Sequence, residues 1–539
     1  MDDRPDPLLR TRALPAGQEW WKRAVFYQLS PRSFQDTDGD GVGDLGGVLR
    51  RLAHLDWLGV DAVWLCPIFP TPNADFGYDI SDYTGVDPQL GTIDQLDELI
   101  ARLHERAQRL LLDFVPNHTS DQHPWFQESR SSRDNPKRDW YVWRDARPHG
   151  SPPNNWLSRF GGSAWEWDEA TGQFYYHAFL KQQPDLNWAN PEVRAAMHKV
   201  LRFWLDRGVD GFRVDASAVL AEDPLLRDDP PNPDAGSRPP PEAHIRAFSD
   251  NRPETLGWIE EIRKVVDEYP DRVLLAEVQT ADGQLAAFHG SAEHPRFHMP
   301  LNYRLLDVSW DAASLHAGID RYLRDLPEGA WPNWVLGSHD KPRIRSRVGA
   351  DQAANAAMLL FTLPGSPVFY AGDEIGMPDV EVPTELATDP FERLIPGWGL
   401  NRDPHRAPFR WDASEKAGFT TGEPFLPVGG DLKGWNLADQ KAAPRSLLQL
   451  YRQLIELRHR LPVLRDGRYE PLAGDPEVLS YRRVGRSQVL TVALNLTAEA
   501  RAIATPPRAH VLLSTCLDRE GAAPPQLELR PHEGVVLLG

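Results

Sequence analysis

The residues best suited to chemistry are three carboxylates, each of which ends a short apolar run. The segments are Gly211–Asp215, Val273–Glu277 and Trp334–Asp340. Runs of this kind are typical of buried parallel strands, whose carboxyl ends meet at one edge of a sheet. Three acids brought together there could supply a nucleophile, a proton donor and a group that anchors a substrate. Each acid taken alone could instead cap the helix that follows its strand.

Basic and imidazole side chains accompany these acids. Arg213 and Asp215 are two residues apart, so on a strand both side chains point to the same side, and the guanidinium would hold the carboxylate ionised. A structural ion pair is the alternative. Glu277 is reached through four apolar residues, which suits a proton donor in a poorly hydrated pocket. His118 and His339 end two further runs without a second nearby metal ligand, so we expect hydrogen-bonding imidazoles rather than a metal centre.

A separate acidic loop has the spacing of a cation site. Oxygen ligands would come from Asp36, Asp38, Asp40, the backbone carbonyl of Val42, and Asp44. Acids at alternate positions with glycines between them wrap around hard cations. Gly47 stands where an EF-hand has its bidentate Glu, so we expect a structural Ca²⁺ or Mg²⁺ rather than a sensor. An acidic turn without a metal is the alternative, and no organic cofactor is expected.

The elements that would position these groups alternate between strand and helix. Strand-like runs are predicted at 25–29, 62–66, 110–115, 211–214, 273–276, 299–303, 334–337 and 368–370. Eight such runs with helical stretches between them predict an α/β fold, a (β/α)8 TIM barrel. We expect the barrel in residues 1–116 and 188–464, a subdomain inserted after strand 3 at 117–187, and a C-terminal antiparallel β-sandwich at 465–539.

Composition narrows the function classes. The chain of 539 residues has a formal charge of −19, which disfavours nucleic acid or an anionic membrane as a partner. Two cysteines cannot form a disulfide framework, no run is long enough to span a membrane, and the start lacks a secretory signal, so we expect a cytoplasmic protein. The 19 Trp, partly beside polar clusters, suit a small sugar substrate. Oligomeric state stays open between monomer and homodimer.

Taken in order, these segments resemble the alpha-amylase superfamily of glycoside hydrolases over essentially the whole chain. Its four best-known segments are matched by Asp113–His118, Gly211–Ala216, Leu274–Val278 and Ser338–Asp340. The segment Gln183–Asn187 resembles the marker of the alpha-glucosidase and oligo-1,6-glucosidase branch, and Gly365–Glu374 resembles the eighth-strand segment. One departure is Ser338, where the family usually has Asn.

The resemblance implies a retaining mechanism on α-linked glucose. Asp215 would be the nucleophile, Glu277 the acid/base, and Asp340 the carboxylate that grips the distorted sugar. The substrate-binding residues would be His118, Arg213, His339, Asp75, Tyr78, Phe160, Phe179, Gln183 and Arg402, with Arg406 close to the last of them. The acidic loop from Asp36 to Asp44 matches the metal loop of the branch. A pocket closed at the non-reducing end would make the enzyme exo-acting.

The expected activity is therefore hydrolysis of terminal α-1,4-linked glucose from maltose and short oligosaccharides, with transglycosylation possible. Ala216 resembles the α-1,4-preferring enzymes, since α-1,6-preferring ones have Val there. An isomerase of the same fold, of trehalose synthase or sucrose isomerase type, is the alternative, because Thr119–Phe126 resembles trehalose synthases. A non-catalytic carbohydrate-binding protein would require a missing acid. The proline-rich loop 227–241 either shapes the pocket or is a surface feature.

Overall fold

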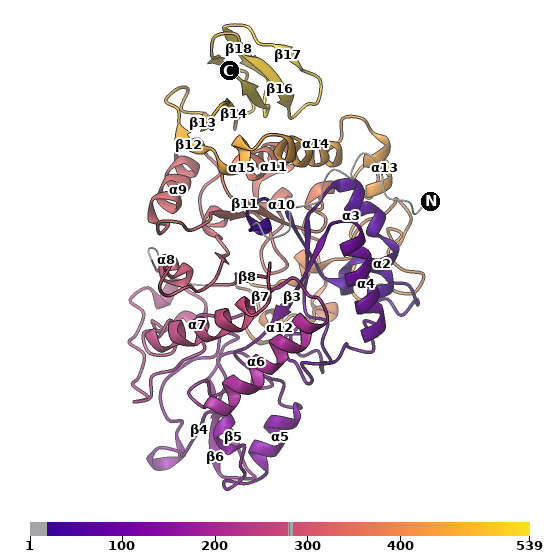
Figure 1. Ribbon diagram of the computed structural model, residues 1–539. Helices are drawn as coiled ribbons and strands as arrows, with labels where there is room; N and C mark the ends of the chain where they lie inside the picture. The colour runs from indigo at the N-terminus through magenta and orange to yellow at the C-terminus, as the bar shows by residue number, and fades with distance from the viewer. Residues whose placement is uncertain (1–18, 279, 281–283) are drawn as a thin grey trace.

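A closed ring of parallel strands forms the centre of the molecule. The computed structural model describes residues 19–278, 280 and 284–539 (Figure 1). The strands are β1 (Phe26–Leu29), β2 (Ala62–Leu65), β3 (Arg109–Phe114), β7 (Gly211–Val214), β8 (Val273–Ala276), β9 (Met299–Pro300), β10 (Asn333–Val335) and β11 (Ser366–Tyr370). They are paired in the order β10-β11-β1-β2-β3-β7-β8-β9. The predicted barrel is confirmed.

Side-chain amides join the two ends of this order. The backbone amide of Asn302 donates to Oδ1 of Asn333 at 2.9 Å, and Nδ2 of Asn333 donates to the carbonyl of Pro300 at 2.7 Å. The sixth strand, predicted at 299–303, ends at Pro300, because proline has no N–H for a ladder and the amides of Asn302 and Asn333 take over the pairing.

Helices alternate with the strands and pack around the sheet (Figure 1). They are α1 (Pro31–Phe34), α2 (Leu45–Arg50), α3 (Leu52–Leu58), α4 (Ile93–Glu105), α6 (Pro191–Asp206), α7 (Pro253–Asp267), α8 (Leu285–His289), α9 (Ala312–Asp325), α10 (Ile344–Val348), α11 (Ala353–Thr362) and α14 (Leu447–Arg460). Helix α6 buries Val193, Met197, Val200 and Trp204, which follow its three- and four-residue steps. The apolar faces of the helices and of the strands thus pack into one core.

A small subdomain is inserted between β3 and α6, as predicted. It contains α5 (Pro124–Ser131) and a three-stranded antiparallel sheet ordered β4 (Trp143–Arg144), β6 (Gln173–Tyr176), β5 (Trp165–Asp168). Aromatic rings form its core: Trp156 and Trp165 stack at 6.1 Å, and both contact Tyr176. In Figure 1 this sheet lies at the opposite end of the molecule from the C-terminal strands.

The C-terminal region is an antiparallel sandwich, which confirms the prediction. Its larger sheet has the order β12 (Arg468–Pro471), β13 (Val478–Val484), β14 (Val489–Asn495), β19 (Gly534–Leu538), β16 (His510–Ser514), β17 (Gly521–Ala522). The pair β15 (Arg501–Ala504) and β18 (Gln526–Leu529) covers it through Ile503, Leu527 and Val535.

The chain between β11 and α14 is long and mostly irregular. It contains α12 (Pro390–Leu394) and α13 (Leu437–Ala442), and α15 (Val463–Asp466) leads on into the sandwich. None of the helices in the described ranges is long and apolar enough to cross a membrane.

Candidate active site

Two of the predicted acids stand side by side because their strands are neighbours in register. Val214 on β7 pairs with Ala276 on β8, so Asp215 and Glu277 follow at the same level. Arg213 binds both: its Nη1 donates to Oδ1 of Asp215 at 2.7 Å, and its Nη2 donates to Oε2 of Glu277. Both carboxylates line one cavity of about 540 Å³.

Arg213 is itself held in place by residues of neighbouring strands. It is 1% exposed, and its Nη1 donates to Oδ1 of Asp113, its register partner on β3, at 2.6 Å. The indole N–H of Trp64 donates to the other oxygen of Asp113 at 2.9 Å. A guanidinium shared by three carboxylates cannot rotate freely, so it sets the direction of Asp215 and Glu277.

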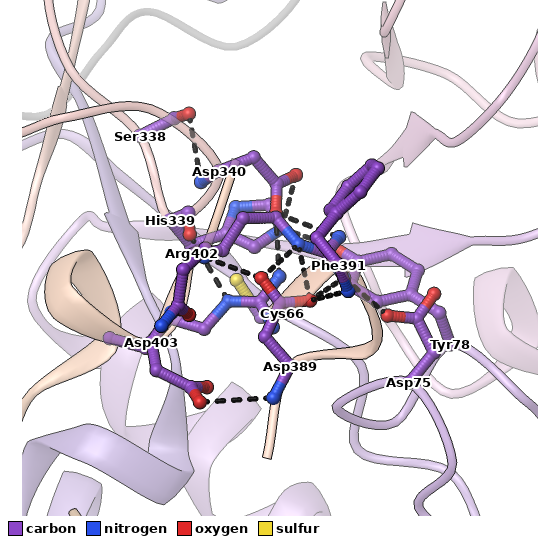
Figure 2. Close-up of polar contacts among 12 residues, drawn as sticks. Cys66, Asp75, Tyr78, Ser338, His339, Asp340, Asp389, Phe391, Arg402 and Asp403 are labelled. Atoms are coloured by element: carbon purple, nitrogen blue, oxygen red, sulfur yellow. Dashed lines mark hydrogen bonds and ion pairs between the residues drawn. The ribbon is translucent and has the colours of Figure 1, made fainter. Parts of the chain in front are cut away.

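The third acid is held by basic groups. Arg406 donates to Oδ1 of Asp340 at 2.6 Å. Arg402 approaches the same oxygen at 3.4 Å, and Nε2 of His339 lies 3.0 Å from Oδ2 (Figure 2). Burial pushes the pKa of Asp340 upward, but the hydrogen bond from His339 and the positive charges of Arg402 and Arg406 outweigh it and hold the pKa well below its ordinary value. Ser338 accepts from the backbone N–H of Asp340 at 3.3 Å, so the departure from Asn leaves the turn supported.

Protonation differs across the site. Burial raises the pKa of Asp215 well above its ordinary value, Arg213 opposes this, and the nearby Glu277 adds to it. A negative charge on Asp215 is thus disfavoured by burial and by its acidic neighbours and favoured by the guanidinium of Arg213. Burial lowers the pKa of His118 to about 4, which makes this imidazole neutral at pH 7, as a hydrogen-bonding role requires.

One end of the cavity is closed by an ion pair. Nη2 of Arg402 donates to Oδ1 of Asp75 at 2.7 Å, and Gln183 donates to the other oxygen of Asp75 at 3.2 Å. The buried carboxylate of Asp389 holds Arg402 from behind at 2.8 Å (Figure 2). Tyr78 is nearby and stacks on His339 with ring centroids 5.7 Å apart. This end therefore offers polar atoms to a sugar rim.

Aromatic rings form a wall beside this closed end. Phe160 packs against Phe391 at 4.5 Å and against Phe179 at 6.4 Å. The guanidinium of Arg402 lies over Phe160 and Phe391, at 5.3 and 5.1 Å from their centroids. Flat apolar faces next to hydrogen-bonding groups match the two faces of a pyranose.

The structure brings together all the predicted catalytic and substrate-binding residues. Those that line the cavity are Asp75, Tyr78, His118, Phe160, Phe179, Asp215, Glu277, Asp340 and Arg402. Arg213, His339 and Gln183 lie behind them, each at most 1% exposed and in contact with a lining residue. Between the two arginines considered for one position, Arg402 lines the cavity, and Arg406 supports Asp340 from the interior.

Sequence reasoning missed several residues of this site. Phe391 and Asp389 come from the long segment after β11, where the only local signal is an Asp-Pro helix start that says nothing about a ligand. Pro239 and Pro241 line the cavity, so the proline-rich loop does shape the pocket. Its prolines indicated a stiff loop but not the direction in which it folds.

The predicted metal loop lies outside this cavity. Carboxylate oxygens of Asp36, Asp38 and Asp40 lie within 4.8 Å of one another. Burial raises the pKa of Asp36, but hydrogen bonds from Thr420 and backbone amides lower it below its ordinary value, so the group is ionised. Asp44 also caps α2, since its Oδ1 accepts from the N–H of Gly47 at 2.7 Å.

A barrel with paired carboxylates at its strand ends, in a cavity closed at one end, defines a glycoside hydrolase site. The model of the alpha amylase catalytic domain family matches residues 28–467, and a domain of unknown function family matches residues 464–536. The chain belongs to the alpha-amylase family of glycoside hydrolases, which confirms the recognition made from the sequence.

Relatives and solved structures agree with this assignment. The chain is 37% identical to an oligo-1,6-glucosidase of Heyndrickxia coagulans (89% of this chain, 92% of that one). It is 38% identical to maltase A1 of Drosophila melanogaster (92% and 90%). Among solved structures, an alpha-glucosyl transfer enzyme, XgtA, has a TM-score of 0.89 at 39% identity (96% and 99%). The trehalulose synthase MutB of Pseudomonas mesoacidophila MX-45 has a TM-score of 0.87 at 35% identity (96% and 99%).

Proposed function

We propose that this enzyme is a retaining, exo-acting alpha-glucosidase that releases terminal α-1,4-linked glucose from maltose and short oligosaccharides, with transglycosylation as a side reaction. The observation that carries the proposal is the placement of Asp215 and Glu277 on one guanidinium, beside a cavity end closed by Asp75 and Arg402. A relative named as a maltase supports the action on maltose, and a relative named as an oligo-1,6-glucosidase supports the glucosidase activity but not the preference for the α-1,4 linkage.

In this mechanism the two acids divide the work. Glu277 donates a proton to the glycosidic oxygen as Asp215 attacks the anomeric carbon, and the leaving sugar departs with that proton. Glu277 then removes a proton from water, which attacks the same carbon and releases glucose with its original configuration. Asp340, ionised through its basic neighbours, accepts hydrogen bonds from the distorted ring.

The exo specificity follows from the ion pair at the closed end. Asp75 and Arg402 stand where a longer chain would have to continue beyond the terminal glucose. Opening a route there would require breaking contacts of Arg402 with Asp75, Asp340 and Asp389. We therefore expect single glucose units to be released, rather than longer fragments.

The linkage preference is assigned to the residue after the nucleophile. Ala216 lines the cavity with φ +45°, a backbone region in which a β-branched residue is strained. Ala216→Val should lower the ratio of kcat/KM on maltose to that on isomaltose, on the order of tenfold for one well-placed steric conflict. Ala216→Thr is the control, because threonine has nearly the shape of valine and should lower the ratio equally if shape alone is responsible. If Ala216→Val left the ratio unchanged, Ala216 would not determine the linkage preference.

The competing function is isomerisation, favoured by the likeness to a trehalulose synthase. An isomerase must keep water out while it retains the leaving sugar. Products from maltose, sucrose and isomaltose decide the question when separated by chromatography. Free glucose in stoichiometric amounts supports hydrolysis, whereas trehalose, isomaltulose or trehalulose as the main product supports the isomerase.

We also propose a structural Ca²⁺ or Mg²⁺ at the acidic loop. The three gathered carboxylates of Asp36, Asp38 and Asp40 present hard oxygen donors, with the backbone of Val42 and the side chain of Asp44 completing the predicted set. An ion at a hundredfold excess over its Kd would stabilise the fold by about 2.7 kcal/mol. EDTA should therefore lower Tm in the parent but not in Asp38→Asn/Asp40→Asn. If EDTA left the Tm of the parent unchanged, the proposed ion would be rejected.

We propose that the reaction takes place in the cytoplasm on neutral sugars. The formal charge of −19 suits a substrate without negative charge. Cys66 and Cys516 are both free, which a reducing compartment would preserve. Fractionation of cells that express the tagged protein tests this placement.

A further inference from the structure

A buried glutamine at the start of the barrel contacts the active-site histidine. Gln28 is on β1 and is 0% exposed. Its Nε2 lies 2.6 Å from Nδ1 of His339 and 3.6 Å from the sulfur of Cys66. The mechanism above gives Gln28 no task, although its amide sits directly behind the histidine that faces Asp340.

The surroundings of His339 decide which of its nitrogens carries the proton. Nε2 lies 3.0 Å from Oδ2 of Asp340 and 2.8 Å from the hydroxyl of Tyr78. A lone pair on Nε2 would face the carboxylate of Asp340, which is unfavourable, so a neutral ring needs its proton there. Nδ1 must then accept, and the group opposite it has to be a donor, which the NH2 of Gln28 supplies.

These contacts form one directed chain of hydrogen bonds. Gln28 donates to His339, whose Nε2–H points to Asp340 and Tyr78. The hydroxyl of Tyr78 is 3.4 Å from Asp113, to which it can donate, and Asp113 anchors the guanidinium of Arg213. The donor at the head of the chain therefore affects the direction of every later bond.

We propose that Gln28 is a positioning residue that fixes His339 in the tautomer with its proton on Nε2, and so keeps Asp340 aimed at the sugar ring. The proposal rests on the glucosidase reaction proposed above. The other groups around the ring are consistent with it: Trp64 meets His339 edge-on at 6.3 Å, and Arg406 binds only its backbone carbonyl. The amide nitrogen of Gln28 also lies 3.6 Å from the sulfur of Cys66, a weak acceptor to which the NH2 can donate.

The first test removes the donor. Gln28→Leu should lower kcat/KM on maltose by about 10- to 100-fold, by analogy with the loss of a partner that orients a metal-binding histidine. The matched control is Gln108→Leu. Gln108 is also a buried glutamine; it directly precedes β3, and its side chain donates to the carbonyl of Val60. This control should lose thermal stability while its kcat/KM stays at the parental level.

The second test separates positioning from a general packing effect. In a His339→Asn background, Gln28→Leu should cause no further loss of kcat/KM, because its route of action is already gone. Gln28→Glu should show kcat/KM that falls as pH rises. Its carboxylate favours a doubly protonated ring, and when that ring loses a proton, the remaining one stays on Nδ1 facing Glu, away from Asp340.

A third measurement does not depend on turnover. Spectra of the parent and of His339→Asn, both labelled with ¹⁵N-histidine, identify the nitrogens of His339 by difference and show which one is protonated. A proton on Nδ1 in the parent would overturn the proposal, as would equal losses from Gln28→Leu in both backgrounds. If the parent released no glucose from any substrate, the proposed function would fail, and the NMR result would still decide the role of Gln28.

Discussion

Replacement of Asp215 by alanine is expected to abolish turnover, with kcat on maltose lower by on the order of 10⁴- to 10⁶-fold, as for loss of a nucleophile in other covalent enzymes. The fold should survive, because Arg213 keeps Asp113 and Glu277 as partners and no buried charge is left alone. Measurements of kcat and of Tm on the same preparation check both parts.

The chemistry of the Asp215→Ala variant gives a sharper readout. Azide can enter the space left by the carboxylate and attack the anomeric carbon of an activated α-glucoside from that side, which yields β-glucosyl azide. Asp215→Asn, which keeps the shape and removes the charge, is the matched variant and should show little rescue. Parental activity in Asp215→Ala, or α-glucosyl azide as its product, would assign the nucleophile elsewhere.

The second large effect concerns the proton donor. Glu277→Gln should lower kcat/KM on maltose by about 10²- to 10⁴-fold, the usual range for general acid–base catalysis. The rate of the first step on p-nitrophenyl α-glucoside should fall much less, since its leaving group needs no proton. Azide should then intercept the covalent intermediate on Asp215 and give α-glucosyl azide, with overall retention.

Asp307→Asn is the control for this variant, because Asp307 is another carboxylate of the same cavity and makes none of the contacts that orient the reacting pair. Its effect should not depend on the leaving group. A Glu277→Gln enzyme that lost maltose and p-nitrophenyl α-glucoside hydrolysis equally would argue against its role as the proton donor.

The barrel and the acids were predictable because both depend on short-range patterns. A parallel strand buried on both faces is a continuous apolar run, and the first polar residue after it lies at the catalytic edge. Asp215 and Glu277 could therefore be found from their own segments, and the register of β7 and β8 then places them together. The alternation of strand and helix likewise gave the insertion after β3.

Residues on irregular chain could not be found in this way. Phe391 and Asp389 belong to a segment without periodicity, so only the folded chain shows that they meet Phe160 and Arg402. Gln28 could not be found for a different reason. Nothing in its sequence neighbourhood shows that its partner is His339, more than 300 residues away in the loop after β10. The early end of β9 at Pro300 depends in the same manner on two distant amides.

The walls of the cavity come from three long excursions between the strands, and two of these also carry residues assigned to the terminal glucose. Phe160 belongs to the inserted subdomain, Pro239 and Pro241 to the proline-rich loop, and Phe391 to the segment after β11. New acceptors or leaving groups could thus be recruited by exchanging the proline-rich loop alone, since the subdomain carries His118 and Gln183 and the segment after β11 carries Arg402, which contact the terminal glucose in the proposed mechanism.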